Sequence, residues 1–354
     1  MSRFWSQAAQ RCEPYVPGEQ LNQPGIIKLN TNENPYSPSP AVVEAIETEA
    51  ANQLNLYPSP TVDQLRERIA DANELTKENV FVGNGSDEVL AFSFMAFFDQ
   101  GKAIRFPDIS YSFYPVYARL FNIPFKSIPL RDDFTIPAEA FFQSDGGVIF
   151  PNPNAPTSVY LELEAIKNIA NQNPDQVVII DEAYIDFASG SAVSLIHDYE
   201  NVLIIQTMSK SRSLAGLRVG YALGNAELIS GLTRIKDSFN SYTLDRLAIA
   251  GAVEAINASD YYVNITAKII ATREWSFSEM RKRGFTVLPS QANFLFATHA
   301  SFPAETLYVK LKEAGILIRY FNKPRIENYV RITIGTDKQM QQFFHALDKI
   351  LSCV

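Results

Sequence analysis

Short runs of β-branched, aliphatic and aromatic residues alternate with longer stretches in which apolar residues recur at helical spacing. Seven such runs lie in the first two thirds of the chain, at residues 80–82, 103–106, 125–128, 148–150, 177–180, 202–206 and 219–223. Continuous apolar strands that alternate with helices are typical of a mostly parallel sheet covered on both faces. The pattern therefore predicts an α/β fold, with a three-layer αβα unit around a mostly parallel seven-stranded sheet.

The last third of the chain has a different pattern. Residues 244–256 and 262–280 have helical periodicity, and the second stretch is long enough to bridge two units of structure. A smaller α+β unit follows, with predicted strands at 286–288, 293–297, 316–318 and 330–334 and predicted helices at 304–313 and 338–351. We expect three parts: an N-terminal arm that packs with the small domain (1–30), a large domain (31–255) and a small C-terminal α+β domain (256–354).

Composition adds to this picture mainly by excluding partners. The 354-residue chain is 46% hydrophobic, like ordinary globular proteins, and has a formal net charge of −8. Nucleic acids and anionic membranes attract clustered Lys and Arg, but the sequence has no basic run. It also has no apolar stretch of transmembrane length and no apolar signal-peptide segment at its start. We expect a cytoplasmic protein that binds neither nucleic acid nor membranes.

Cysteine and histidine are too few and too scattered to indicate a metal site. Cys12 and Cys353 lie near opposite ends of the chain, and His197, His299 and His345 show no ligand spacing. We therefore expect no metal and no disulfide framework, and catalysis by a Ser–His or Cys–His pair is not indicated.

One lysine is surrounded by residues suited to chemistry. Lys210 lies in a polar turn between the predicted strands 202–206 and 219–223, among hydroxyl side chains and near Arg218. An amine that is desolvated and flanked by cations has a lowered pKa and can act as a Schiff-base nucleophile. The alternative is an exposed lysine in a serine-rich loop, and only the rest of the chain distinguishes the two.

Two further residues follow predicted strands, at the edge where parallel sheets bind ligands. Asp181 ends the apolar run 177–180, and a carboxylate there is costly to desolvate unless it meets a cation or a protonated ring nitrogen. Tyr111 follows the run 103–106 and is either a core residue or a stacking platform for a flat ligand.

Residues 83–87 combine two glycines with Ser86 and Asp87 at the start of a predicted helix. Such a segment forms a cradle of backbone N–H groups for an anion, although an ordinary helix cap has the same appearance. It is not the dinucleotide-binding fingerprint, because Glu88 occupies the place of the third glycine.

Two arginines and one tyrosine are candidates for a substrate site. Arg319 and Arg331 lie in predicted strands, where a half-buried arginine pairs with a carboxylate or phosphate, either of a substrate or of the protein itself. Tyr57 lies in the proline-containing loop 54–60, where anchoring the turn is the alternative role.

Taken in order, the segments 152–157, 181–184 and 209–218 resemble the pyridoxal-phosphate aminotransferases of the aspartate aminotransferase fold, known as fold type I. The resemblance covers nearly the whole chain. Within this superfamily the sequence is most similar to the class II histidinol-phosphate aminotransferases, on account of residues 14–18, 32–36, 57–58 and 331–336.

The resemblance implies a pyridoxal 5′-phosphate cofactor and a role for each of the residues above. Lys210 holds the cofactor covalently and carries a proton during the reaction, Asp181 keeps the ring nitrogen protonated, and Tyr184 bonds the ring hydroxyl. Tyr111 stacks on the ring. The residues that take the phosphate are Gly85, Ser86, Asp87, Thr207, Ser209 and Arg218.

The sequence departs from the family pattern at two positions. Ala155 stands where much of the family has the asparagine that contacts the ring hydroxyl, and we expect the adjacent Asn154 to supply this contact. Ser158 stands where the family usually has glycine, which we regard as tolerable.

At the substrate end, the resemblance implies that Arg331 binds the carboxylate of glutamate. Tyr15, Asn32, Tyr57 and Arg319 are expected to surround the substrate tail and its phosphate. Tyr57 is expected to reach the site of a neighbouring subunit, so the active form is a homodimer.

The expected reaction is transamination between glutamate and imidazole-acetol phosphate, a phosphorylated imidazole substrate, giving 2-oxoglutarate and L-histidinol phosphate in histidine biosynthesis. Two alternatives within the fold are an aminotransferase of aromatic or neutral amino acids and a decarboxylase of a phosphorylated amino acid. A non-catalytic binding protein is the alternative from another class, and it would not change absorbance when the cofactor is added.

Overall fold

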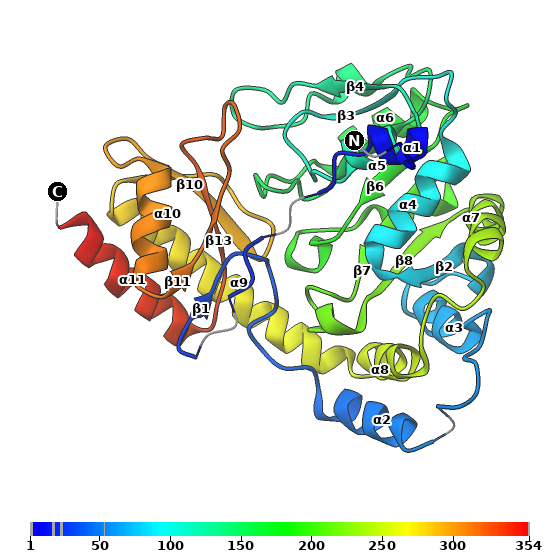
Figure 1. Cartoon of the computed structure of the whole chain (residues 1–354), viewed down its shortest axis with the longest axis horizontal. Helices are drawn as coiled ribbons and strands as arrows, with labels where there is room; N and C mark the ends of the chain where they lie inside the picture. Colours follow the sequence, from blue (N-terminus) through cyan, green and yellow to red (C-terminus); the bar gives the residue numbers. More distant parts are fainter. Residues whose placement is uncertain (1–2, 16–17, 22–23, 53, 353–354) are drawn as a thin grey trace.

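The computed structural model describes residues 3–15, 18–21, 24–52 and 54–352, which form a large unit around a seven-stranded sheet and a smaller unit beside it (Figure 1). The strand order of the large sheet is β2-β8-β7-β6-β5-β3-β4. Its strands are β2 (Val80–Asn84), β3 (Ile104–Pro107), β4 (Phe125–Ile128), β5 (Val148–Pro151), β6 (Val178–Asp181), β7 (Val202–Thr207) and β8 (Val219–Gly224).

The prediction of a mostly parallel sheet is confirmed. Strands β3 to β7 pair in parallel, whereas β8 is antiparallel to both β2 and β7. Strand β8 reverses because it follows β7 through a turn, residues 208–218, that contains a single 3-10 turn rather than a crossover helix. This turn contains Lys210, and it lies at the carboxyl edge of β7, where the neighbouring parallel strands also end.

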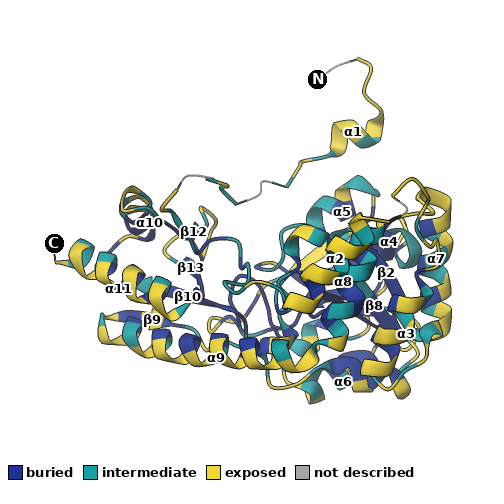
Figure 2. Cartoon of the chain, turned by 90° about the horizontal axis from the view of Figure 1, so that it is seen from below, coloured by how far each residue is buried: buried dark blue, intermediate teal, exposed yellow. Residues whose placement is uncertain are grey.

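Successive residues of each strand point to opposite faces of the sheet, as strand geometry requires. In β6, Val178 and Ile180 belong to the core on one face, and Ile179 belongs to the core on the other face. The first face is covered by α2 (Pro40–Ala50), α3 (Asp63–Ala72), α6 (Leu163–Asn171) and α8 (Arg246–Asn257), and the second by α4 (Gly85–Phe97), α5 (Tyr114–Leu120) and α7 (Ala226–Phe239). Figure 2 shows the buried residues concentrated in the strands and on the inward sides of these helices.

The smaller unit contains an antiparallel sheet of order β12-β13-β10-β9. Its strands are β9 (Phe285–Val287), β10 (Phe294–His299), β12 (Arg319–Tyr320) and β13 (Val330–Thr333), packed with α10 (Ala304–Glu313) and α11 (Asp337–Leu351). Helix α9 (Ser259–Lys282) runs from the large unit along the smaller one (Figure 1). The predicted strand 316–318 is in fact β11 (Ile316–Leu317), which pairs with β1 (Ile27–Lys28), whereas β12 pairs with β13 in the four-stranded sheet.

The N-terminal arm contacts both units. Glu19 accepts hydrogen bonds from Lys312 (2.6 Å) and Tyr308 (3.1 Å) of α10, in the smaller unit. Helix α1 (Gln7–Arg11) instead lies against α5, where Arg11 Nε donates to the Arg119 carbonyl and Glu13 pairs with the Arg119 side chain. The arm therefore contacts the smaller unit through Glu19 and the large unit through α1.

Across the described ranges, no helix has both the length and the apolar composition needed to cross a membrane.

Candidate active site

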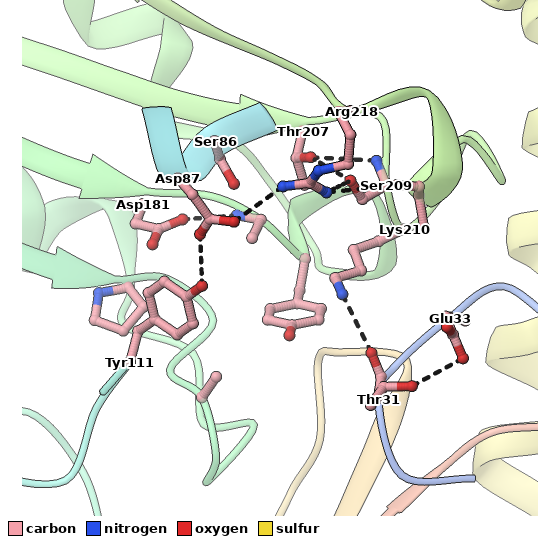
Figure 3. Close-up of a pocket in the computed structure, with 15 residues that line it drawn as sticks. Thr31, Glu33, Ser86, Asp87, Tyr111, Asp181, Thr207, Ser209, Lys210 and Arg218 are labelled. Carbon is pink, nitrogen blue, oxygen red and sulfur yellow. Dashed lines mark hydrogen bonds and ion pairs between the residues drawn. The ribbon is translucent and has the colours of Figure 1, made fainter. Parts of the chain in front are cut away.

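A cavity of about 290 Å³ opens at the carboxyl ends of β6 and β7, facing the first turn of α4 (Figure 3). It brings together residues that lie up to 187 positions apart, between Thr31 and Arg218. The sequence-predicted residues that line it are Ser86, Asp87, Tyr111, Asp181, Tyr184, Thr207, Ser209, Lys210 and Arg218.

Lys210 extends its amine into this cavity from the turn after β7 (Figure 3). Its Nζ donates to the Thr31 carbonyl (3.3 Å) and lies 5.8 Å from the centre of the Tyr184 ring. The turn is held by Asn34, whose side-chain amide donates to the carbonyls of Lys210 and Ser211, each at 3.0 Å. We assigned no role to Asn34 from the sequence, although it belongs to the 32–36 segment that marks the resemblance.

Asp181 provides a buried carboxylate in the cavity wall. Its side chain accepts a hydrogen bond from the Tyr114 hydroxyl (2.8 Å) and a longer one from the Ala183 amide (3.3 Å). Burial raises the pKa of Asp181 to about 6, and the Tyr114 hydrogen bond opposes that rise. Within the described ranges Asp181 has no cationic side chain in ion-pair contact, and Lys210 lowers its pKa only from a distance, so a cationic group of a ligand would stabilise its ionised form.

Tyr114 is a site residue that our sequence analysis missed. It is fully buried as the first residue of α5, and its ring packs edge-on against the Tyr111 ring at 5.8 Å. The two residues meet because a turn before the helix joins the Tyr114 amide to the Tyr111 carbonyl (3.2 Å), which helical spacing does not predict since Tyr111 precedes α5.

The anion cradle forms around the first turn of α4. Gly85 has φ of +77°, and a side chain there would collide with the Arg218 guanidinium, so glycine allows arginine to approach the helix start. Arg218 Nη1 lies 3.5 Å from Ser209 Oγ, which is 3.0 Å from Thr207 Oγ1. Free backbone N–H groups, two hydroxyls and a guanidinium form a site suited to a phosphate.

The structure corrects our interpretation of the helix start. The N-cap of α4 is Asn84, which makes no side-chain capping bond, and Ser86 and Asp87 lie within the first turn. Asp87 contributes its side chain as well as its backbone N–H group. Its carboxylate accepts from the Tyr111 hydroxyl (2.6 Å) and pairs with Arg218 Nη2 (3.0 Å), so it links the stacking ring to the phosphate arginine (Figure 3).

Tyr184 and Asn32 are positioned together. The Tyr184 hydroxyl accepts from the Asn32 side-chain amide (2.9 Å), and its ring packs edge-on against Phe294 at 5.1 Å. Asn32 is buried and also exchanges hydrogen bonds with Thr333 (3.0 and 2.9 Å). These contacts fix Tyr184 at the boundary between the cavity and the smaller unit.

Asn154 does not line the cavity, whose wall at this point is Ala155. Asn154 is fully buried, and its side-chain amide donates to the Ile109 carbonyl (3.0 Å) and to Thr157 Oγ1 (2.9 Å). Its two N–H donors are therefore committed to Ile109, after β3, and to Thr157 of its own loop. Its Oδ1 has no hydrogen-bond partner among the described residues.

A second cavity of about 500 Å³ continues outward from the first and shares Tyr184, Lys210 and Arg218 with it. Of the predicted substrate residues, those that line it are Tyr15, Asn32, Arg319 and Arg331. The Tyr15 ring stacks on Phe113 with 4.4 Å between the ring centres, and the Arg319 guanidinium lies 5.6 Å from the Phe321 ring.

Arg331 has the properties of an anion receptor. Its guanidinium lies near the rings of Phe294 (5.2 Å) and Phe321 (5.6 Å), and Nη2 donates to the Asn30 carbonyl (2.9 Å). Its buried Nε has no hydrogen-bond partner within the part of the chain that is described. Burial lowers the pKa of Arg331, because a desolvated cation is costly, and an anionic ligand would offset this cost.

Tyr57 lies apart from both cavities. Its side chain is 77% exposed, and its ring stacks on that of Tyr242 with 4.7 Å between the ring centres.

Comparison with known proteins places the site in context. Residues 24–347 match the family model "Aminotransferase class I and II". The chain is 60% identical over 351 residues to histidinol-phosphate aminotransferase 1 of Oceanobacillus iheyensis, covering 99% of both chains. It is 54% identical over 354 residues to the histidinol-phosphate aminotransferase of Clostridium acetobutylicum, covering both completely.

Solved structures have the same fold. The histidinol-phosphate aminotransferase of Sinorhizobium meliloti in complex with pyridoxal-5′-phosphate aligns with a TM-score of 0.89 at 22% identity, over 100% of this chain and 99% of that one. A solved histidinol-phosphate aminotransferase structure from Clostridium acetobutylicum, which is a different sequence from the 54% identical relative, aligns with a TM-score of 0.85 at 25% identity, over 93% of this chain and 100% of that one.

Proposed function

Because the chain belongs to the class I and II aminotransferase family, we propose that it transfers an amino group from glutamate to imidazole-acetol phosphate. The products are 2-oxoglutarate and L-histidinol phosphate, and the pathway is histidine biosynthesis. Full-length relatives at 53–60% identity named as histidinol-phosphate aminotransferases support this assignment.

The cofactor is pyridoxal 5′-phosphate, which acts as an electron sink at the substrate α-carbon. The residues of the inner cavity fit this group. An amine, a buried carboxylate without a cationic partner among the described side chains, and a phosphate cradle line the same cavity of about 290 Å³. This juxtaposition of Lys210, Asp181 and Arg218 is the observation on which the proposal rests.

Each residue of the inner cavity has a separate role that follows from its position. Lys210 would hold the cofactor covalently through its amine, and the same amine, once freed by substrate, would accept and return the α-carbon proton. Asp181 would hold the proton on the ring nitrogen, whose charge would offset the desolvation of the carboxylate. Tyr111 would stack on the ring, and Tyr184 would donate its hydroxyl hydrogen to the ring oxygen. Arg218 would bind the phosphate with the first turn of α4.

The outer cavity is suited to substrates with acidic groups. Arg331, which has a free donor at Nε within the described chain, would bind the glutamate carboxylate through two parallel hydrogen bonds. Arg319 and Tyr15 lie further out, where the phosphate of the imidazole substrate would reach. Since such phosphorylated compounds are charged and do not cross membranes readily, we propose that the enzyme works in the cytoplasm.

We also propose that the active form is a homodimer in which Tyr57 completes the outer cavity of the neighbouring subunit. The exposed apolar residues near Tyr57 support this arrangement, since a large apolar patch on a protein surface marks an interaction site. These residues are Val43, Leu54, Leu56 and Tyr242. Helix α2, which carries Val43, has one buried residue, Val42, and its outer side is exposed (Figure 2).

The covalent step is tested by reducing the loaded protein with borohydride and mapping the modified peptide. We expect the adduct on Lys210 and none in the Lys210→Ala variant. An adduct on Lys236, which is buried and donates to the Pro60 carbonyl (3.0 Å), would contradict the assignment.

The substrate is tested separately by comparing the turnover of histidinol phosphate with that of phenylalanine and tyrosine. We expect a clear preference for the phosphorylated compound. A preference for the aromatic amino acids would favour the broader aminotransferase, and release of carbon dioxide without consumption of a keto acid would favour a decarboxylase.

A further inference from the structure

The segment Leu54–Pro60, called here the Tyr57 loop, is held by one arginine of another element. Arg246 is the first residue of α8, directly after the N-cap Asp245. Its Nη2 donates to the Tyr57 carbonyl (2.8 Å) and its Nε donates to the Leu56 carbonyl (3.2 Å). Its Nη1 pairs with Glu49 near the end of α2 (3.2 Å). One guanidinium thus joins α2, α8 and the backbone beneath the Tyr57 ring.

Two other contacts act on the Tyr57 loop. Tyr242 stacks on the Tyr57 ring from the segment that leads into α8. Lys236 of α7 donates to the Pro60 carbonyl (3.0 Å) at the far end of the loop. Arg246 bonds the main chain at Tyr57, so together with Tyr242 it fixes the direction in which the exposed ring projects.

This geometry orders the Tyr57 loop before its ring meets a partner. An exposed side chain gains little from being fixed on its own surface, because ordering the loop costs conformational entropy. A group that is already ordered binds without paying that cost again, and a small misplacement in an active site lowers the rate strongly. The planar guanidinium suits this task, because it bonds two carbonyls and a carboxylate in fixed directions.

We propose that Arg246 is a positioning residue for the active site of the neighbouring subunit, where it acts by holding the Tyr57 loop. The inference rests on the proposed function, since it requires that Tyr57 enters the partner's outer cavity. Arg246 itself touches neither cavity of its own chain.

The chain offers a closely matched control in Arg66. Its guanidinium also bonds two carbonyls, those of Val80 (2.9 Å) and Lys77 (2.7 Å), and a carboxylate, that of Asp63 (3.2 Å). The side chains of Arg66 and Arg246 are similarly exposed, at 20% and 24%. Arg66 lies outside the cavities and outside the Tyr57 loop. Its substitution therefore measures the general effect on the enzyme of losing an arginine that bonds two carbonyls and a carboxylate.

The test uses hybrid dimers loaded with cofactor, prepared with two purification tags. One subunit carries Lys210→Ala, so the only complete site combines Lys210 of the unaltered subunit with Tyr57 of the Lys210→Ala subunit. We expect Arg246→Met to lower kcat/KM for histidinol phosphate by roughly tenfold to a hundredfold when it is placed on the Lys210→Ala subunit. Placed instead on the subunit that keeps Lys210, Arg246→Met should leave the activity within about twofold. The loop that it loosens then contributes to the inactive site of the Lys210→Ala subunit.

Arg66→Met should have no effect that depends on which subunit carries it. Chymotrypsin provides a second measurement, because cleavage within the Tyr57 loop should be faster in the Arg246→Met homodimer than in the Arg66→Met homodimer. If Arg246→Met does not form dimers, as judged by sedimentation, Arg246→Lys takes its place in the same hybrids and should show the same asymmetry with a smaller loss.

The result that overturns the proposal is a loss that follows the subunit with the functional Lys210, or one that is equal in both placements. Two controls separate this failure from others. Tyr57→Ala on the Lys210→Ala subunit must lower activity, and if it does not, the shared site is wrong. If the unaltered homodimer does not turn over histidinol phosphate, the proposed function itself fails and the proposal fails with it.

Discussion

Two adjacent carboxylates at the end of β6 lie in very different regions of the molecule. Asp181 and Glu182 are 4% and 1% exposed, and burial raises their pKa values to about 6 and about 7. Because side chains alternate along a strand, Asp181 points to the cavity and Glu182 points to the opposite face of the sheet. The first has one side-chain donor, Tyr114, and the second has several.

The donors around Glu182 make it a structural residue. Its carboxylate accepts from Ser191 Oγ (2.6 Å), the Ala192 amide (2.7 Å) and Gln206 Nε2 (2.8 Å), and Gln206 in turn accepts from Tyr221 (2.8 Å). The hydrogen-bonding capacity of Glu182 is largely used within the protein, whereas Asp181 keeps capacity for a ligand. A raised pKa alone therefore does not identify a functional carboxylate, because structural networks perturb pKa values as well.

The largest effect on the transamination rate is expected when the charge of Asp181 is removed. Asp181→Asn should lower the transamination rate at least about a hundredfold, since it removes preorganised charge at the position that holds the ring proton. Single-turnover absorbance measurements with the cofactor content determined per subunit provide the check. A rate within threefold of the unaltered enzyme would contradict the assigned role.

A smaller effect is expected when the hydroxyl that supports Asp181 is removed. Tyr114→Phe removes a hydrogen bond to a charged group, which is typically worth about 1.5–3 kcal/mol, so cofactor affinity should fall about tenfold or more. Fluorescence titration of the cofactor-free protein measures this change. Tyr117→Phe is a suitable control, because its hydroxyl bonds the Asp87 carbonyl instead of Asp181. Equal losses in the two variants would indicate general damage to α5.

On the opposite face, Glu182→Ala should affect stability more than rate. It leaves buried donors of Ser191, Ala192 and Gln206 without an acceptor, and such groups cost about 1–3 kcal/mol each when they remain unsatisfied. We expect a lower urea midpoint and a rate per folded, loaded subunit within about threefold of the unaltered enzyme. A large loss of rate at full cofactor occupancy would instead place Glu182 among the residues of the reaction.

The smallest expected effect is on the way the stability of the folded protein changes with pH. Both carboxyls have folded pKa values above their unfolded values, so the folded cofactor-free protein binds more protons and its stability falls as pH rises from about 4 to about 7. Bound cofactor supplies a positive charge to Asp181 and should remove its share of this fall, while the share of Glu182 persists. Urea midpoints measured across this range should therefore fall less steeply in the loaded protein.

Cofactor-free Asp181→Asn is the control for this measurement, and its slope with pH should approach that of the loaded protein. Identical slopes in the loaded and cofactor-free forms of the unaltered protein would contradict the assignment of the shift to Asp181.

Much of the site was predictable because of where each residue stands relative to a strand. Asp181 and Lys210 follow long apolar runs, and the carboxyl ends of parallel strands meet at one edge, so local pattern alone placed them together. The predictions for Tyr57 as a partner's residue and for Asn154 as a ring contact came from resemblance. The structure leaves the first as a proposal and directs the donors of Asn154 to Ile109 and Thr157.

The sequence by itself determined the elements, the carboxyl edge and the residue types gathered there, because strand alternation and helical periodicity are local properties of the chain. Only the tertiary structure decided the contacts between distant segments: Tyr114 with Asp181, Asp87 between Tyr111 and Arg218, and Arg246 beneath Tyr57. These contacts depend on how helices pack on the sheet and on each other. No local pattern records that packing, since the partners lie between 24 and 189 positions apart in the chain.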